Sequence, residues 1–320
     1  MKHASTRKHS GRGPGARPTL KNVDFLSARD VFAAFDEVDR VGLRPTCTML
    51  DPWYNKGIGG VVDEAEYDRF IEELLIRACR ISDHVYLWGF PEIIGPYVRS
   101  VPKSHELVAW LTWYYKNNPS VIRGWRSSQF ACLHIATPTA KLYPEEFLNQ
   151  IQRVRFQEGT LRYIPGPTSV IEAPLIIGFV GMDEQTGHPA QKPVAVYDKL
   201  IRMVTTEGDL IFDPMCGSGT TGVVATIRER RALLCDMDVE YLAMARTRLD
   251  RDYSGRAERL DHIGNNPDKP KAGRAIQEQH DLGLLETGHP DSRMVDAPGS
   301  RKRGRPPKRG NGNLAIGLAK

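Results

Sequence analysis

Short apolar runs alternate with amphipathic stretches along most of the chain. Runs at 46–50, 83–89, 107–115, 128–136, 209–213 and 231–238 have the length and the β-branched or aromatic content of strands. Residues 64–80 predict a helix, because apolar side chains recur there at helical spacing: Tyr67, Phe70, Ile71, Leu74, Leu75 and Ala78. Further helices are expected within 187–204, with Pro193 near the first turn, and over 220–230 and 239–249. Strands alternating with helices predict a doubly wound, mostly parallel α/β sheet.

The flanking segments have a different composition. Residues 1–20 are rich in Gly, Ser, Lys and Arg, and 263–320 in Pro, Gly, Asn and charged residues, so both are expected to be disordered. The intervening 21–262 is expected to form one domain. Within it, the proline-rich and irregular stretch 138–186 is expected to be an insertion over the sheet.

Positive charge is concentrated at the two ends. Residues 1–18 hold five Lys/Arg and residues 300–320 hold seven, with no acid in either, whereas the whole chain has a net charge of only +5. The middle of the chain is therefore mildly acidic. Basic ends of this composition commonly contact nucleic-acid phosphates, although they can also serve solubility alone.

Membrane, disulfide and metal chemistry are not indicated. The sequence has no run of about 18 apolar residues and no apolar N-terminal signal. Its five cysteines are scattered without a CxxC pair, and five of its nine histidines lie in or at the border of the ends expected to be disordered: His3, His9, His262, His280 and His289. The pattern favours a reducing cytosol and no metal site.

The stretch DPMCGSGTT at 213–221 joins a predicted strand to a predicted helix. Gly217 and Gly219 allow a sharp turn, and the helix start offers free N–H groups. Asp236 follows 19 residues after Gly217, at the end of the next strand, where an acid can accept both hydroxyls of a ribose; Asp238 is expected to cap the following helix instead. The turn lacks the third glycine of a dinucleotide fingerprint and the lysine of a phosphate loop. It suits a nucleoside ligand without pyrophosphate, and S-adenosylmethionine (AdoMet) fits that description.

The tetrad DPWY at 51–54 follows an apolar strand. Asp51 offers carboxylate oxygens, Pro52 a rigidly directed carbonyl, and Trp53 and Tyr54 flat faces for stacking. Two acceptors bonding an exocyclic amino group could free its lone pair for attack on a methylsulfonium. Taken alone, the tetrad is also compatible with an ordinary Asp-Pro turn; its pairing with the glycine turn favours the chemical interpretation.

These motifs together resemble the β-class amino DNA methyltransferases, in which the catalytic motif precedes the cofactor motif, a circularly permuted order. DPWY matches the family's (D/N/S)PP(Y/F), and GHPAQKP (187–193) matches the segment beside the methionine end of the cofactor. The glycine turn and CDMDVEYLAMARTRL (235–249) match the cofactor loop and the ribose-binding strand and helix. The resemblance covers residues 22–250 and implies a Rossmann-like, seven-stranded methyltransferase fold with 138–186 as a target-recognition insertion.

The resemblance also implies roles for individual residues. Asp51 and the Pro52 carbonyl would bind the target amino group and Tyr54 would stack on the flipped base, with Trp53 completing the tetrad. Asp236 would hold the ribose, and an upstream acid, Asp30, would contact the adenine unless it is only a helix N-cap. The remaining cofactor contacts implied are His188, Gln191, Lys192, Pro193, Asp213, Pro214, Cys216, Gly217, Ser218, Gly219, Thr220 and Thr221.

One departure affects the expected substrate pocket. The family has a second proline where this chain has Trp53, which puts the shape of the base pocket in question. Asp at the first tetrad position usually accompanies adenine N6 in this family, and Ser often accompanies cytosine N4. Adenine is therefore the preferred substrate, with cytosine as the alternative.

The C-terminal segment RKRGRPPKR (301–309) resembles an AT-hook. Its core, Arg303, Gly304, Arg305 and Pro306, can lie in a narrow A·T minor groove with the arginines reaching inward. A generic basic tail is the alternative. With double-stranded DNA as the partner, we expect a cytoplasmic, nucleoid-associated enzyme; a homodimer and a cognate restriction endonuclease remain open.

Two other functions stay open at this point. A DNA-binding architectural protein could keep the fold without activity, and Trp53 leaves room for this. A methyltransferase acting on RNA or protein glutamine could use a similar tetrad, but such enzymes typically place the cofactor motif first.

Overall fold

The computed structural model describes residues 22–56, 60–118, 121–122 and 124–262. The basic N-terminal arm expected over 1–20 lies outside these residues. So do the expected tail 263–320 and its AT-hook-like core from Arg303 to Pro306.

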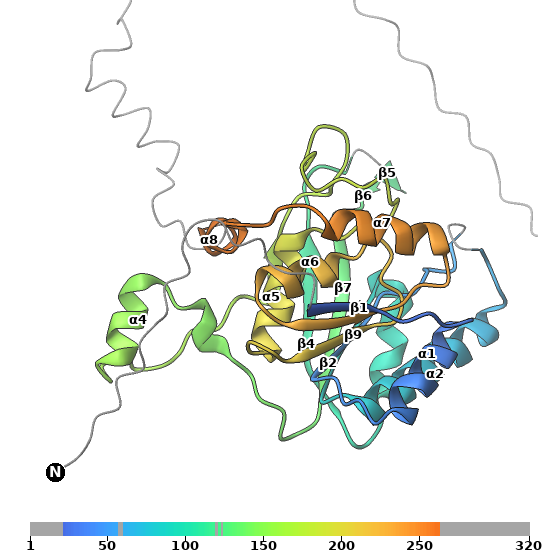
Figure 1. Ribbon diagram of the computed structural model, residues 1–320, viewed down its shortest axis with the longest axis horizontal. Helices are drawn as coiled ribbons and strands as arrows, with labels where there is room; N and C mark the ends of the chain where they lie inside the picture. Colours follow the sequence, from blue (N-terminus) through green and yellow to red (C-terminus); the bar gives the residue numbers. More distant parts are fainter. Residues whose placement is uncertain (1–21, 57–59, 119–120, 123, 263–320) are drawn as a thin grey trace, which may run out of the picture. The chain divides into compact units, whose positions relative to one another are not determined.

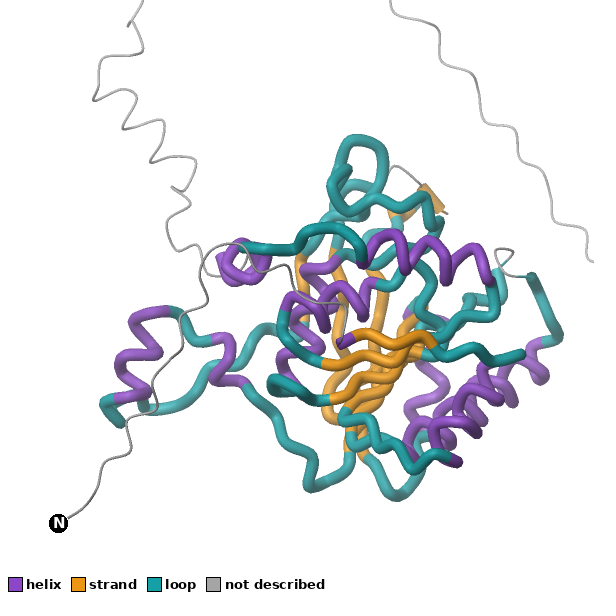
Figure 2. The backbone as a smooth tube through the Cα atoms, in the orientation of Figure 1, coloured by secondary structure: helices purple, strands orange, loops and turns teal. Residues whose placement is uncertain are grey.

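An eight-stranded sheet forms the centre of the domain (Figures 1 and 2). Its order is β1-β10-β9-β2-β3-β7-β4-β8. In chain order its strands are β1 (Val23–Phe25), β2 (Cys47–Leu50), β3 (His84–Gly89), β4 (Glu106–Tyr114), β7 (Gln129–Ala136), β8 (Val170–Glu172), β9 (Leu210–Asp213) and β10 (Arg231–Leu234). A separate antiparallel pair consists of β5 (Val121–Ile122) and β6 (Trp125–Arg126).

Helices cover both faces of this sheet (Figure 2). Those of one side are α1 (Val31–Arg40), α2 (Glu64–Ile81), α3 (Pro91–Ile94) and the 3₁₀ helix η2 (Gly95–Ser100). Those of the other side are α5 (Val194–Val204), α6 (Thr220–Ile227), α7 (Val239–Leu249) and α8 (Arg256–His262). The 3₁₀ helix η3 (Pro144–Phe147) and α4 (Gln150–Gln157) complete the described helices. Side chains of β3 alternate between the two cores: Tyr86 and Trp88 face one, and Val85 and Leu87 the other.

The predicted doubly wound, mostly parallel sheet is confirmed; the number of strands and the burial of Trp110 differ from the prediction. The sheet has eight strands rather than seven, because Val170–Glu172, expected within an irregular insertion, pairs in parallel with β4 as an edge strand. Only β7 runs antiparallel to its neighbours β3 and β4. Trp88 and Trp113 are core residues as expected, but Trp110 is 38% exposed because it lies near the sheet edge, where few elements cover it.

The neighbouring strands β2 and β9 bring the two sequence motifs together. They pair in parallel, with Thr48 opposite Phe212, although they come from distant parts of the chain. On one side of this pair the chain progresses through β3, and on the other through β10, so the pair is the topological switch point where α/β sheets bind ligands. Asp51 and Asp213 therefore lie at the same carboxyl edge of the sheet.

The predicted recognition insertion, 138–186, occupies two ends of the sheet. It begins after Ala136, which pairs with His84 at the amino end of β3, and Tyr143 N–H donates to the carbonyl of Met203 at the end of α5. Helix α4 then stands away from the body of the domain (Figure 1). The chain returns along β8, whose Glu172 pairs with Tyr114, to the carboxyl edge where Asp51 lies. Whether any part of it reads DNA stays a prediction.

The glycine turn needs its glycines for two physical reasons. Gly217 and Gly219 adopt left-handed φ angles of 49° and 73°. A Cβ on Gly219 would lie 2.8 Å from Cβ of Ala245 on α7, so a side chain there would also clash. The turn can therefore lie close against α7 only with glycine at this position.

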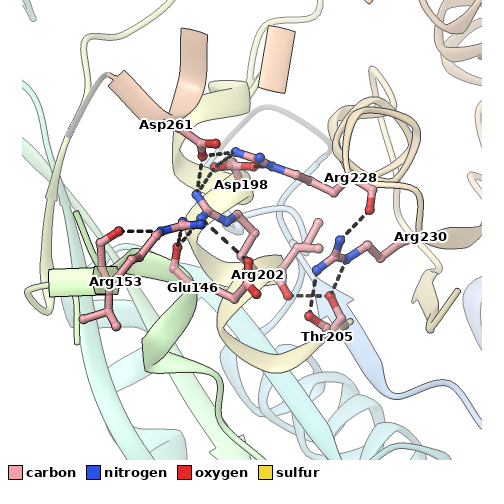
Figure 3. Close-up of polar contacts among 10 residues, drawn as sticks. Glu146, Arg153, Asp198, Arg202, Thr205, Arg228, Arg230 and Asp261 are labelled. Atoms are coloured by element: carbon pink, nitrogen blue, oxygen red, sulfur yellow. Dashed lines mark hydrogen bonds and ion pairs between the residues drawn. The ribbon is translucent and has the colours of Figure 1, made fainter. Parts of the chain in front are cut away.

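A buried ion network holds α5 against α6 and α8 (Figure 3). Arg228, just after α6, forms a bidentate pair with Asp198 of α5, at 2.6 and 3.0 Å. Arg228 and Arg202 both donate to Asp261 of α8, each at 2.9 Å. The Asp198 side chain is only 4% exposed, so its charge depends on these arginines. The network fixes the two helices whose first turns meet at the glycine turn.

Asp198→Asn is expected to destabilise the domain by about 3–5 kcal/mol, because Arg228 and Arg202 lose the more buried of the two carboxylates that they share and keep only the partly exposed Asp261. Lys116→Met, which removes a partner from the exposed and solvent-screened Lys116–Glu172 pair, should leave the free energy of unfolding nearly unchanged. Urea unfolding of both variants measures the difference. Equal losses would show that the network contributes no more than a surface pair.

Asp213 is a buried acid at the end of β9. Its carboxylate accepts hydrogen bonds from Thr221 Oγ1 at 2.5 Å and from Met215 N–H at 3.2 Å, which ties the two ends of the glycine turn together. Burial nonetheless raises the pKa of Asp213 to about 7. The folded chain therefore binds a proton at this site, between its ordinary pKa of 3.8 and about 7, that the unfolded chain has lost.

This proton makes stability depend on pH in a definite direction. Ionising Asp213 costs nothing below its unfolded pKa and costs progressively more as the pH rises from about 4 to 7. Asp213→Asn should therefore gain stability relative to wild type across this window, by roughly 4 kcal/mol at most. Unfolding curves at several pH values test this, with the exposed Glu207→Gln as control. A constant difference between Asp213→Asn and wild type would contradict it.

Candidate active site

A cavity of about 420 Å³ opens at the carboxyl edge of β2, β9 and β10. It collects most of the residues that the sequence singled out. These are Asp51, Pro52, Trp53, Tyr54, His188, Gln191, Lys192, Asp213, Pro214, Cys216, Gly217, Ser218, Thr220 and Asp236. We call it the cofactor cavity, for the ligand that the sequence predicts there.

Four of the predicted residues do not line this cavity. Asp30 accepts from Ala33 N–H at 2.8 Å and caps α1, as the alternative reading expected, while its neighbour Val31 lines the cavity. Thr221 bonds to Asp213, Gly219 packs on α7, and Pro193 is the N-terminal cap residue of α5. These residues support the site without lining the cavity.

The acid at the end of β10 is joined to the glycine turn. Asp236 accepts from Gly217 N–H at 2.8 Å and from Asp238 N–H at 3.0 Å. Asp238 in turn accepts from Glu240 N–H and caps α7, as predicted. A carboxylate has four acceptor positions, so Asp236 keeps capacity for hydroxyl donors in the cavity.

The GHPAQKP segment forms another wall of the cavity. The His188 ring packs on Tyr241, with centroids 4.3 Å apart, and burial lowers the pKa of His188, so the ring is neutral at pH 7. Gln191 is held within its own loop, because its amide accepts from Thr186 and donates to the Glu184 carbonyl. Its amide therefore fixes the loop.

Asp51, Tyr54 and Lys192 form a closed hydrogen-bonded triangle. Tyr54 Oη donates to Asp51 Oδ1 at 2.9 Å, and Lys192 Nζ donates to Asp51 Oδ2 at 2.5 Å and to Tyr54 Oη at 2.8 Å. Burial raises the pKa of Tyr54 well above its ordinary value, so its hydroxyl stays protonated. The triangle fixes both oxygens of the Asp51 carboxylate.

Trp53 and Tyr54 point to different surroundings. Trp53 packs against α2, with its ring 4.6 Å from that of Phe70, and its carbonyl accepts from Tyr67 Oη at 2.6 Å. Tyr54 instead faces Phe90 and Phe130, with centroids 5.1 and 5.4 Å away. Only Tyr54 therefore lies where the sequence expected an aromatic face for a base.

A second cavity, of about 370 Å³, adjoins the first and has aromatic walls. We call it the aromatic cavity; Tyr54, Phe90, Trp113 and Phe130 line it. Tyr54 and Lys192 line both cavities, so the triangle lies at their junction. The sequence analysis missed Phe90 and Phe130; their positions, just after β3 and early in β7, place them at the carboxyl edge of the sheet and were the available signal.

The described residues form neither a membrane-spanning helix nor a metal-binding cluster. No described helix is long and apolar enough to cross a membrane. No group of three or more His, Cys, Asp or Glu side chains within 22–262, gaps aside, is arranged to hold a metal ion.

Comparisons with known proteins identify relatives over most of this domain. Type II methyltransferase M.HpaI of Haemophilus parainfluenzae is 26% identical over 222 residues, which cover 65% of this chain and 68% of that protein. DNA adenine methyltransferase YhdJ of Escherichia coli is 41% identical over 69 residues, which cover 22% of this chain and 24% of YhdJ. This chain thus spans about a quarter of YhdJ and two thirds of M.HpaI.

Solved structures share the fold. The M1.HpyAVI–SAM complex has a TM-score of 0.56 at 19% identity, covering 72% of this chain and all of that one. The cytosine-N4-specific PvuII DNA methyltransferase has a TM-score of 0.52 at 18% identity, covering 77% of this chain and 92% of that one. A family model described as DNA methylase matches residues 46–247, which span the triangle, the glycine turn and Asp236. The chain therefore belongs to this family of N6/N4 DNA methylases.

Proposed function

We propose that this protein transfers a methyl group from AdoMet to the exocyclic amino group of a base flipped out of duplex DNA, with adenine N6 as the acceptor. The observation that carries the proposal is the position of Asp51, which lines the cofactor cavity and is hydrogen-bonded to Tyr54 and Lys192, two residues that line both cavities. A carboxylate there can hold an amino group between a methyl donor on one side and a stacked base on the other.

The residues of the cofactor cavity fit AdoMet. Asp236 offers acceptor positions for ribose hydroxyls, and the left-handed glycine at 217 allows close approach of the backbone. Apolar and aromatic walls such as Val31, Phe70 and Met237 suit an adenine ring. When bound, AdoMet supplies an electrophilic methyl group on a sulfonium.

The chain's own groups would prepare the acceptor. The target base would lie between the rings of the aromatic cavity, where stacking is independent of base identity. Its amino hydrogens would bond to Asp51 and to the Pro52 carbonyl, which aligns the nitrogen lone pair with the cofactor cavity. Because the Asp51 side chain is only 18% exposed, these bonds would be screened less than bonds at the surface.

Adenine is favoured over cytosine on two grounds. The first tetrad residue is Asp, which in this family usually accompanies adenine N6, and YhdJ is named an adenine methyltransferase. PvuII methyltransferase, a structural neighbour, is cytosine-N4-specific, so cytosine stays the alternative. Trp53, the reason to consider an inactive architectural protein, does not line the aromatic cavity and so leaves it open for a base.

Partners follow from the same proposal. Duplex DNA is the substrate, and M.HpaI is named a type II methyltransferase, which supports a cognate restriction endonuclease beside this chain. The basic segment 301–309 would add an A·T minor-groove contact that raises local enzyme concentration without reading the target.

The methylated product tests the proposal directly. Incubation with labelled AdoMet and mixed-sequence duplex DNA, followed by digestion and mass identification, should give N6-methyladenine. Asp51→Ala should reduce the yield at least 100-fold, since it removes the amino acceptor. Asp63→Ala, which removes only an N-cap of α2, should methylate like wild type. N4-methylcytosine as the product would overturn the adenine assignment. DNA that carries no label would overturn the proposed function.

Deletion of 300–320 tests the tail. Loss of its seven Lys/Arg should weaken duplex binding and lower the slope of log Kd against log salt, because fewer counterions are released. The rate at saturating DNA should stay unchanged. Fluorescence anisotropy with A·T-rich and G·C-rich duplexes measures the affinity and its salt dependence. An unchanged affinity and slope would contradict a role in DNA binding.

A further inference from the structure

Lys192 comes from the segment that the family resemblance places beside the methionine end of the cofactor, but its side chain extends toward Asp51. Its Nζ lies 2.5 Å from Asp51 Oδ2 and 2.8 Å from Tyr54 Oη. The side chain is only 3% exposed. A buried ammonium needs a compensating anion, and here that anion is the proposed acceptor of the target amino group.

We infer that Lys192 is a positioning residue for the methyl-accepting amino group, holding the Asp51 carboxylate in place as its counter-ion, rather than a contact to the cofactor. This inference rests on the proposed function. It assigns to the base side of the site a residue that sequence resemblance assigns to the cofactor side.

The charges around Asp51 support this role. Among the described side chains, Lys192 is the one that forms an ion pair with Asp51. The other titratable groups that interact with it bring no positive charge. Tyr54, Tyr67 and Tyr197 are neutral phenols and Cys132 is a neutral thiol. The half-buried His188 is neutral at pH 7, and Asp213 has the same sign when ionised. Without Lys192, the charge of Asp51 would have no cationic partner in this part of the site.

The surroundings of Lys192 restrict where its ammonium can go. The rings of Tyr54, Trp88 and Phe130 lie 5.5, 5.9 and 5.3 Å from Nζ, within the range of cation–π attraction. Its backbone carbonyl accepts from Thr220 Oγ1 at 3.0 Å, and Pro193 follows at once as the N-terminal cap residue of α5. The backbone is thus attached to the glycine turn while the head group is fixed at Asp51.

The hydrogen-bond geometry leaves room for the substrate. Tyr54 occupies one acceptor position on Oδ1, and Lys192 one on Oδ2. Each carboxylate oxygen has two such positions, so one on each remains for an amino hydrogen. Bonds to both oxygens stop rotation of the carboxylate about its Cβ–Cγ bond, which fixes the direction in which those positions point. Orientation of this kind is a recognised source of rate acceleration.

The test separates the two sides of the site. Lys192→Met and Lys192→Arg are compared with wild type for kcat and KM on duplex DNA at saturating AdoMet, and for AdoMet Kd by calorimetry without DNA. We expect Lys192→Met to lower kcat about 100-fold or more while AdoMet Kd changes less than threefold. Lys192→Arg should recover part of kcat, because it restores a cation beside Asp51.

The opposite result would overturn the inference: AdoMet Kd raised tenfold or more in Lys192→Met, with kcat near wild type. If Lys192→Met fails to fold, because it leaves Asp51 buried and unpaired, the double variant Lys192→Met/Asp51→Asn removes both charges. AdoMet Kd near wild type in the double variant supports the inference, and a Kd raised tenfold overturns it. If the wild-type protein methylates no DNA, the proposed function is wrong. If the wild-type protein is active and Lys192→Met is impaired only in AdoMet binding, the proposed function stands and only the role of Lys192 is wrong.

Discussion

The site depends on the parallel pairing of β2 with β9. These strands belong to opposite ends of the domain sequence, and their registered pairing, Thr48 opposite Phe212, sets the tetrad beside the glycine turn. Backbone hydrogen bonds between two buried strands allow little slippage, because a one-residue shift would turn every side chain to the wrong face. The distance between the Asp51 carboxylate and the glycine turn is therefore fixed by sheet register and depends little on the intervening loops.

Packing outside the cavities preserves this register. The ion network of Asp198, Arg228, Arg202 and Asp261 ties α5 to α6 and α8, and the glycine turn lies close against Ala245 of α7. Because α5 begins at Pro193, immediately after Lys192, any shift of this helix would also move the ammonium that holds Asp51. The same helix thus connects the ion network to the Asp51 carboxylate, through Lys192 just before its first turn.

Much of the fold and of the lining of the cofactor cavity could be predicted from the sequence, because both depend on local patterns. The periodicity of 64–80 and the strand–glycine–helix order at 209–230 are carried by neighbouring residues, and the structure has helix and turn there. Phe90, Phe130 and the edge strand Val170–Glu172 could not be found in this way. Their roles arise from contacts between distant strands, and no local pattern distinguishes Phe130 from an ordinary core residue. Likewise the direction of the Lys192 side chain is set by Asp51, far away in sequence.

The insertion 138–186 shows how topology limits which of its parts can serve the aromatic cavity. Its first part leaves the sheet at the amino end of β3, where Tyr143 bonds to Met203, and α4 follows there. The triangle of Asp51, Tyr54 and Lys192 lies at the opposite, carboxyl edge. The chain reaches that edge only through the edge strand β8, which pairs with the end of β4, and Leu175, Ile176 and Ile177 then line the aromatic cavity. A base held between Tyr54 and Phe130 would therefore contact the last third of the insertion. Helix α4, at the opposite end of the domain, would lie away from that base.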